Sequence, residues 1–303
     1  MTLPRYDADT NPTRPRAITW EDYETRATNE WSELLASNPD EKAVQHWMEL
    51  HPSFVPGGSG SLGLQGGNHG SEMNAVIREA PLKGMGKNRR PDFMWVTHSS
   101  SLVTPVLVEI EKPSKPWFNG LGRPSAEFTQ ALDQIADWKV WFSDSSNREI
   151  FRKTYLGEDP FPDRYLEPQY VLVYGRTAEF EPTTSPHKNA GALRLKRDFM
   201  RRSHEVFLTF DSLRPDPKLR NAITVSQTSN GPTLHAISPT FQSGPVLMTT
   251  TERITDYQRG LARSVYLDDD RRAYLGTRWA HWKQEQAERK KHKGTAMRSL
   301  GGE

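Results

Sequence analysis

The chain contains no cysteine among its 303 residues. This absence excludes disulfide bonds, cysteine-ligated zinc, iron–sulfur clusters and thiol nucleophiles. Any metal ion must therefore be bound by carboxylates, histidines or backbone oxygens. A cysteine-free composition is also compatible with a reducing compartment, and we expect the protein to be cytoplasmic.

Long hydrophobic runs and an excess of one charge are absent as well. No apolar stretch approaches the roughly 18 residues that span a bilayer, and the N-terminus has no apolar signal-peptide core. We therefore expect a soluble protein with no membrane partner. The 40 Lys and Arg nearly balance the 38 Asp and Glu, so only local charge can indicate a partner.

The remaining composition is typical of a globular protein, with 35% hydrophobic residues. Helical spacing of apolar residues predicts two helices between residues 20 and 50. From residue 91 the pattern predicts strand, strand, helix, strand, helix and strand, at residues 91–96, 105–111, 125–142, 169–174, 193–202 and 205–210. This order predicts an α/β fold in which helices flank a mixed central β-sheet.

We expect three regions along the chain. These are a flexible N-terminal arm over residues 1–30, a core over 31–215, and a C-terminal extension over 216–303 that contains a β-hairpin and a basic helical tail. Glycine occupies seven of the fourteen positions in residues 57–70, which predicts a flexible loop. A GxGxxG match in this loop lacks the preceding strand and following helix that a dinucleotide site requires.

Carboxylates are concentrated on the first two predicted core strands. Asp92 lies at the start of one strand, and Glu109 and Glu111 share one face of the next. Oxygen ligands that converge in this way suit Mg²⁺ or Mn²⁺, and such a metal can activate water at a phosphodiester. A solvated strand face can carry the same alternation, so the three carboxylates leave a structural explanation open.

Three stretches resemble the Shedu family of bacterial antiphage nucleases, within the PD-(D/E)xK superfamily. They are DEKAVQHWMELHPSFV, the pair RRPDFMWV and VLVEIEKP, and AEFTQALDQIADWKVWF. The third stretch is similar to the Q-x3-aromatic element of these nucleases, through Gln134 and Trp138. The resemblance covers roughly residues 30–210. It implies a restriction-endonuclease-like core and a metal-dependent DNA endonuclease active in defence against phage.

The resemblance also implies roles for individual residues. Asp92, Glu109 and the backbone carbonyl of Ile110 would bind Mg²⁺ or Mn²⁺. The third motif position, usually lysine, is Glu111 here, with Lys112 adjacent as the second candidate. Two further catalytic candidates are Gln134 and, on an upstream helix, Glu41. Gln134 can equally be a helix-surface amide, and Glu41 can be a solvated first-turn residue favoured by the helix dipole.

Local positive charge indicates a nucleic-acid partner. Six residues are candidate phosphate contacts, in two groups: Arg89 and Arg90, and Lys196, Arg197, Arg201 and Arg202. From Arg271 to the end, nine basic residues face three acidic ones. Trp117 is a candidate to cover the site or stack on a base. We expect a DNA substrate and a homo-oligomer. A nucleic-acid-binding module with a decayed nuclease site, and an assembly or sensor protein, remain alternatives.

Overall fold

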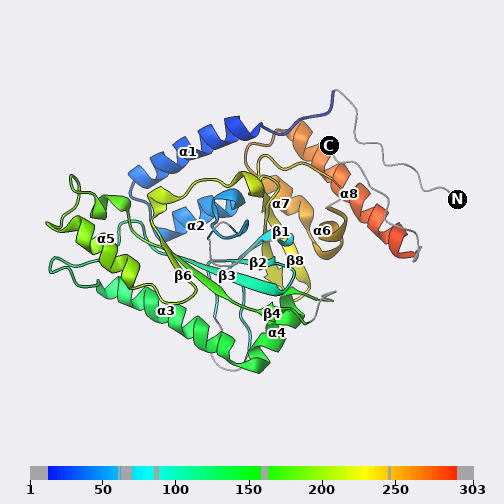
Figure 1. Cartoon of the computed structure of the whole chain (residues 1–303). Helices are drawn as coiled ribbons and strands as arrows, with labels where there is room; N and C mark the ends of the chain where they lie inside the picture. The colour runs from blue at the N-terminus through cyan, green and yellow to red at the C-terminus, as the bar shows by residue number, and fades with distance from the viewer. Residues whose placement is uncertain are drawn as a thin grey trace.

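The structure is a computed structural model that describes residues 13–60, 62, 70–84, 89–157, 163–244 and 247–291. Within these ranges, eight strands form one mixed sheet, and helices lie on both of its sides (Figure 1). The predicted α/β fold with a mixed central sheet is therefore confirmed.

The sheet has the strand order β6-β5-β3-β2-β1-β7-β8, and β4 pairs with β3. The strands are β1 (Ser71–Arg78), β2 (Phe93–His98), β3 (Leu102–Ile110), β4 (Tyr165–Leu166), β5 (Gln169–Val173), β6 (Glu205–Leu208), β7 (Ile223–Thr228) and β8 (Gly231–Ile237). Strands β1, β2 and β3 are antiparallel neighbours, as are β7 and β8. The β1–β7, β3–β4, β3–β5 and β5–β6 pairs are parallel. The predicted hairpin of the two carboxylate-bearing strands is confirmed.

Helices α3 and α4 lie on one side of the sheet in Figure 1, and α1 and α2 lie on the other. The α-helices are α1 (Trp20–Ala36), α2 (Glu41–Leu50), α3 (Ala126–Ser143), α4 (Ser145–Tyr155), α5 (Ala190–Phe199), α6 (Leu247–Arg253), α7 (Tyr257–Arg263) and α8 (Asp269–Lys291). Short 3-10 helices are η1 (Pro52–Phe54), η2 (Thr177–Phe180), η3 (Phe210–Ser212) and η4 (Pro217–Leu219). Helix α3 begins as predicted, because the Ser125 side chain accepts a hydrogen bond from the Phe128 N–H.

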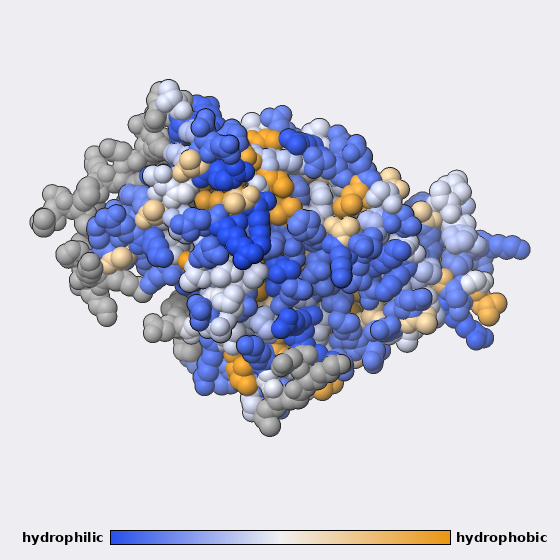
Figure 2. All heavy atoms as spheres, turned by 180° about the vertical axis from the view of Figure 1, so that it is seen from behind, coloured by the Kyte–Doolittle hydropathy of each residue, from blue (hydrophilic) through white to orange (hydrophobic). Residues whose placement is uncertain are grey.

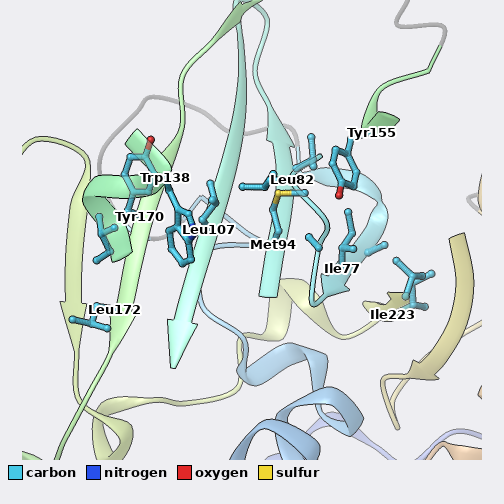
Figure 3. Close-up of a cluster of buried hydrophobic side chains, with 14 of the residues drawn as sticks. Ile77, Leu82, Met94, Leu107, Trp138, Tyr155, Tyr170, Leu172 and Ile223 are labelled. Atoms are coloured by element: carbon cyan, nitrogen blue, oxygen red, sulfur yellow. The ribbon is translucent and has the colours of Figure 1, made fainter. Parts of the chain in front are cut away.

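The alternation of side chains along β3 divides the core into two layers. Leu107 faces the layer that contains Trp138 of α3, and Figure 3 shows both among the buried side chains of that layer. Val106 and Val108 face the layer that contains Trp31 of α1. Each fully buried large apolar side chain contributes roughly 1.5–3 kcal/mol. Both helical layers are thereby fixed on the strands that carry the carboxylates.

The predicted regions need two corrections. The flexible arm expected over residues 1–30 is helical from Trp20 onward, because Tyr23 and Ala27 are buried against the core. The boundary expected at residue 215 falls within one continuous sheet, because β7, which follows it, pairs in parallel with β1, which precedes it. Strand β1 was not predicted from the sequence; in it Met73 and Asn74 have positive φ angles, and the register with β2 shifts.

The first residues of the glycine-rich loop pack against the sheet. Gly57 has φ +103°, and a Cβ atom on Gly58 would lie 2.7 Å from the Trp95 ring. Most of residues 63–70 lie outside the described residues. The suggested role for Trp117 is wrong, because its side chain is fully buried against Phe128 and Tyr174 and cannot stack on a base.

Hydrophilic side chains cover most of the face in Figure 2, where hydrophobic ones form small separate groups. None of the helices in the described ranges combines the length and apolar character that a membrane crossing requires. The homo-oligomer stays a prediction.

Candidate active site

Asp92 and Glu109 meet where β2 begins and β3 ends. Asp92 directly precedes β2, and the antiparallel register pairs Phe93 with Val108. The Ile110 N–H donates a 2.9 Å hydrogen bond to Asp92 Oδ2. The carboxyl groups of Asp92 and Glu109 lie within hydrogen-bonding contact of each other. The sequence therefore identified two carboxylates that the fold brings together from positions 17 residues apart.

Glu109 is buried, with 7% of its surface exposed. Its Oε1 atom accepts a hydrogen bond from the Gln134 side-chain amide of α3. Its Oε2 atom is buried and receives no hydrogen bond from the described residues. Two carboxylates in contact repel each other unless a proton or a cation lies between them. This pair is thus built for one of those two partners.

Two more carboxylates lie close to the pair. Glu111 directly follows β3, and Glu41 occupies the first turn of α2, where the Asp40 side chain accepts a hydrogen bond from the Ala43 N–H. Glu41 and Glu111 both act electrostatically on the pair. We call the four residues Glu41, Asp92, Glu109 and Glu111 the carboxylate cluster.

Burial and mutual repulsion shift the pKa values in the cluster. Burial, with further repulsion from Glu41 and Glu111, raises the pKa of Asp92 to about 7. Burial followed by the charge of Asp92 holds the pKa of Glu109 well above its ordinary value. Burial and then Glu111 raise the pKa of Glu41. The cluster therefore strongly favours positive charge.

Lys115 supplies a positive charge at the carboxylate cluster. Its Nζ atom forms an ion pair with Glu111 Oε2, and its charge also opposes the raised pKa of Glu41. Lys115 was not among the predicted site residues, because it lies in an irregular segment four residues after Glu111. The loop that carries it is held in place by Glu179, whose carboxylate accepts hydrogen bonds from the N–H groups of Trp117 and Phe118.

The Asp92 and Glu109 carboxylates suit a hard divalent cation such as Mg²⁺. In the part of the chain that the structure describes, no group of three or more His, Asp or Glu side chains is placed to hold a metal ion. Mg²⁺ does not need such a group, since it usually keeps several waters and binds through one or two carboxylates together with substrate phosphates. The unsatisfied Glu109 Oε2 atom beside Asp92 matches that requirement. Glu111 and Lys112, the two candidates for the third motif position, adjoin this pair in sequence.

The predicted basic residues fall in two different places. Arg90 is exposed beside Asp92, whereas Arg89 forms an ion pair with Asp137 of α3. The remaining four residues, Lys196, Arg197, Arg201 and Arg202, lie on α5 and the turn that precedes β6. Strands β3, β5 and β6 are parallel. The turn before β6, which carries Arg201 and Arg202, therefore lies at the opposite end of these strands from the end of β3.

The side-chain contacts in the α5 group differ from those of a free phosphate-binding cluster. Arg197 is paired with Asp198, and its side chain is 13% exposed while it packs over the rings of Trp117 and Phe180. Lys196 donates a hydrogen bond to the Gly122 carbonyl. Arg201 and Arg202 are exposed. Arg90 is thus exposed and adjoins Asp92 in sequence, whereas Lys196 and Arg197 are held by the Gly122 carbonyl and the Trp117 ring, in the segment that follows Lys115.

Comparison with known proteins gives one match. No curated protein and no solved structure matches the chain. The family model described as Shedu protein SduA, C-terminal, matches residues 38–214, which include the whole carboxylate cluster and the strands and helices that position it. This match spans more than half of the chain, which therefore belongs to the Shedu protein SduA family.

Proposed function

We propose that this protein is a metal-dependent DNA endonuclease that hydrolyses phosphodiester bonds in bacterial defence against phage. The contact between the Asp92 and Glu109 carboxyls, with Glu109 Oε2 left without a donor, carries the catalytic part of the proposal. Membership of the Shedu family supports the defence role and DNA as the substrate. The same two arguments support a restriction-endonuclease-like core of the PD-(D/E)xK type.

Asp92, Glu109 and the main-chain carbonyl of Ile110 would hold Mg²⁺ or Mn²⁺. When bound, such an ion neutralises charge on the phosphate and supplies an activated water. The Ile110 N–H fixes the Asp92 carboxylate, and the Gln134 amide fixes Glu109. Both contacts leave carboxylate oxygen atoms available for a cation.

Glu111 and Lys115 would act together on the proton transfer. Glu111 is the candidate general base, and its ion pair with Lys115 orients its carboxylate. An ammonium group at this place also offsets the negative charge that a phosphate brings to four carboxylates. Lys115 thereby supplies a charge that the superfamily usually places at the position of Glu111. Lys112 stays the second candidate for that position.

Nicking of a supercoiled plasmid tests the proposal. The wild-type protein should nick DNA with Mg²⁺ or Mn²⁺ and lose activity in EDTA, and Glu109→Gln should lose it with either ion. Asp133→Asn is the matched control, because it removes an exposed carboxylate next to Gln134 and outside the cluster. Equal nicking by the wild type and Glu109→Gln would refute the assignment.

A nucleic-acid-binding module with a decayed nuclease site is the second candidate function. It is favoured by the glutamate at position 111, where this type of nuclease usually has a lysine. The two functions predict different results in one preparation. Salt-dependent DNA binding, with no cleavage in Mg²⁺, Mn²⁺ or other divalent ions, would support the binding module over the nuclease.

A further inference from the structure

A polar cavity of about 740 Å³ opens beside the candidate active site, between α2, the end of β1, the β7–β8 hairpin and α7. Its lining includes three arginines, Arg78, Arg259 and Arg263, against two acids, Glu49 and Asp256. The volume lies within the range of small-molecule binding sites, roughly 300–1,000 Å³. It is thus large enough for a phosphate together with part of its nucleotide.

The floor of the cavity is an internally paired cluster. Glu49 is buried, and its carboxylate lies 2.5 Å from Arg78 Nε and 3.1 Å from His235 Nε2. Arg263 lies with its guanidinium 3.3 Å from the other ring nitrogen of His235, Nδ1. An arginine always donates, so Nδ1 accepts and the proton lies on Nε2, facing Glu49. Glu49 thereby holds the cavity floor in one arrangement and has no remaining role as a counter-ion for α7.

The arginines of α7 leave positive charge at the mouth of the cavity. Arg259 and Arg263 are exposed, and neither forms an ion pair with a carboxylate of the described residues. Their guanidinium groups match the bidentate geometry of phosphate oxygens. Ser226 and Thr233 face each other on β7 and β8 in the same lining, where the Thr233 hydroxyl donates to the Ser226 carbonyl. Asp256 is the opposing charge at the mouth, which leaves the arginines in excess.

The cavity and the carboxylate cluster share one edge of the sheet. The Glu79 N–H, next to Arg78, donates a 2.8 Å hydrogen bond to the Asp92 carbonyl, and Arg78 is in register with Ser226 of β7. Two strand spacings, roughly 10 Å in total, separate β2 from β7. Helix α2 indicates a similar distance between the cluster and the cavity. Glu41 of the cluster lies at its start and Glu49 of the cavity near its end, eight residues or about 12 Å apart.

We propose that this cavity binds backbone phosphate of the DNA that flanks the cleaved bond. Measured along the axis of a duplex, about 10–12 Å corresponds to roughly three base steps at 3.4 Å per step. Arg259 and Arg263 contact the phosphate, and Arg78 fixes the floor beneath it. The identity of the ligand as DNA rests on the proposed function, whereas the site itself rests on the cavity. A free nucleotide has the same chemistry and is the competing source of phosphate.

Fluorescence anisotropy of a labelled DNA duplex in EDTA tests this site without cleavage. Relative to the wild type, Arg259→Ala combined with Arg263→Ala should weaken binding on the order of tenfold and lower the slope of log K against log salt by about two. The matched control, Arg123→Ala with Arg194→Ala, removes two other exposed arginines and should change both quantities much less. Arg259→Ala is the milder variant, because it leaves the contact between Arg263 and His235 in place.

Equal losses in the pocket and control variants, or no loss in the pocket variant, would overturn the proposal. Titration with deoxyadenosine monophosphate and inorganic phosphate separates the sources. Saturable nucleotide binding that the pocket variant loses, with unchanged DNA affinity, would overturn the DNA assignment in favour of a free nucleotide. Because binding is measured in EDTA, the two tests are independent. If the wild type nicks DNA with metal but the pocket variant binds DNA normally, only this inference fails. If nicking does not depend on a metal ion, only the proposed function fails.

Discussion

Replacing Glu109 with glutamine should stabilise the metal-free protein and abolish its response to metal. The wild-type protein holds a buried carboxylate in contact with Asp92, and burial with neighbouring charges raises the pKa of Asp92 from 3.8 to about 7. Three pKa units correspond to about 4 kcal/mol, which is a ceiling for the cost of ionising that site in the fold. Glu109→Gln removes the repulsion that the Asp92 charge exerts on the buried Glu109 carboxylate, so the variant should be more stable by about 1–3 kcal/mol at pH 8.

The sign of the pH dependence follows from the raised pKa values. Between pH 4 and pH 7 the folded protein binds more protons at Asp92 and Glu109 than the unfolded chain does, so its free energy of unfolding falls as the pH rises. Glutamine cannot ionise, and it keeps an oxygen that can accept from Gln134. The advantage of Glu109→Gln should therefore be largest at pH 8 and small at pH 5, where the wild-type pair carries protons.

Urea denaturation in EDTA at pH 5 and pH 8, repeated with Mg²⁺, measures both effects. A cation that binds only the folded wild type at 100 times its dissociation constant adds about 2.7 kcal/mol, and the variant should gain nothing comparable. Asp133→Asn serves again as the control, since its carboxylate is exposed. A Glu109→Gln protein that is less stable than the wild type at pH 8, or that gains equally from Mg²⁺, would refute the reasoning.

Three further predictions concern other parts of the structure. Lys115→Met removes the ion pair with Glu111, so nicking should fall at least tenfold, while Lys115→Arg should retain more activity. Burial lowers the pKa of His51 to about 3, so the folded state resists its protonation. The free energy of unfolding should therefore fall by up to about 3 kcal/mol between pH 7 and pH 4. In urea denaturation, His51→Phe should reduce this dependence on pH. Gly58→Ala should cost about 1–3 kcal/mol because its Cβ would meet Trp95, whereas Gly120→Ala, with nothing within 4 Å, should cost far less; equal melting temperatures for the two variants would contradict this packing.

Local pattern was sufficient for the centre of the site. Strand alternation placed Glu109 and Glu111 on one face, and the antiparallel hairpin then brought Asp92 to the same end. The Ser125 cap and the apolar spacing predicted α3, and the family resemblance singled out Gln134, whose amide the structure places against Glu109. The predictions of the hairpin and of α3 need only a period of two or 3.6 residues and one reversal of the chain, which a sequence displays directly.

Contacts between distant segments could not be read in this way. Strand β1 escaped notice because its bulged start, with positive φ at Met73 and Asn74, breaks the alternation that identifies a strand. The parallel pairing of β1 with β7 joins segments about 150 residues apart, a separation that follows from the registers. That pairing brings Arg78 and Ser226 together in the lining of the cavity beside the carboxylate cluster.

The distribution of charge along the sequence likewise did not show which basic residues lie together in space. The basic group at residues 196–202 is dense in sequence, yet Arg197 is largely covered by aromatic rings, and Arg201 and Arg202 precede β6 at the opposite end of the parallel strands from the end of β3. Arg78 and Arg263 are 185 residues apart and carry no shared motif, yet both line one cavity. A phosphate backbone senses charge in space, within a Debye length of about 10 Å. The distance from the cluster to the cavity is close to that length, so the α7 arginines lie within electrostatic reach of the phosphate backbone that the proposed function places at Asp92 and Glu109.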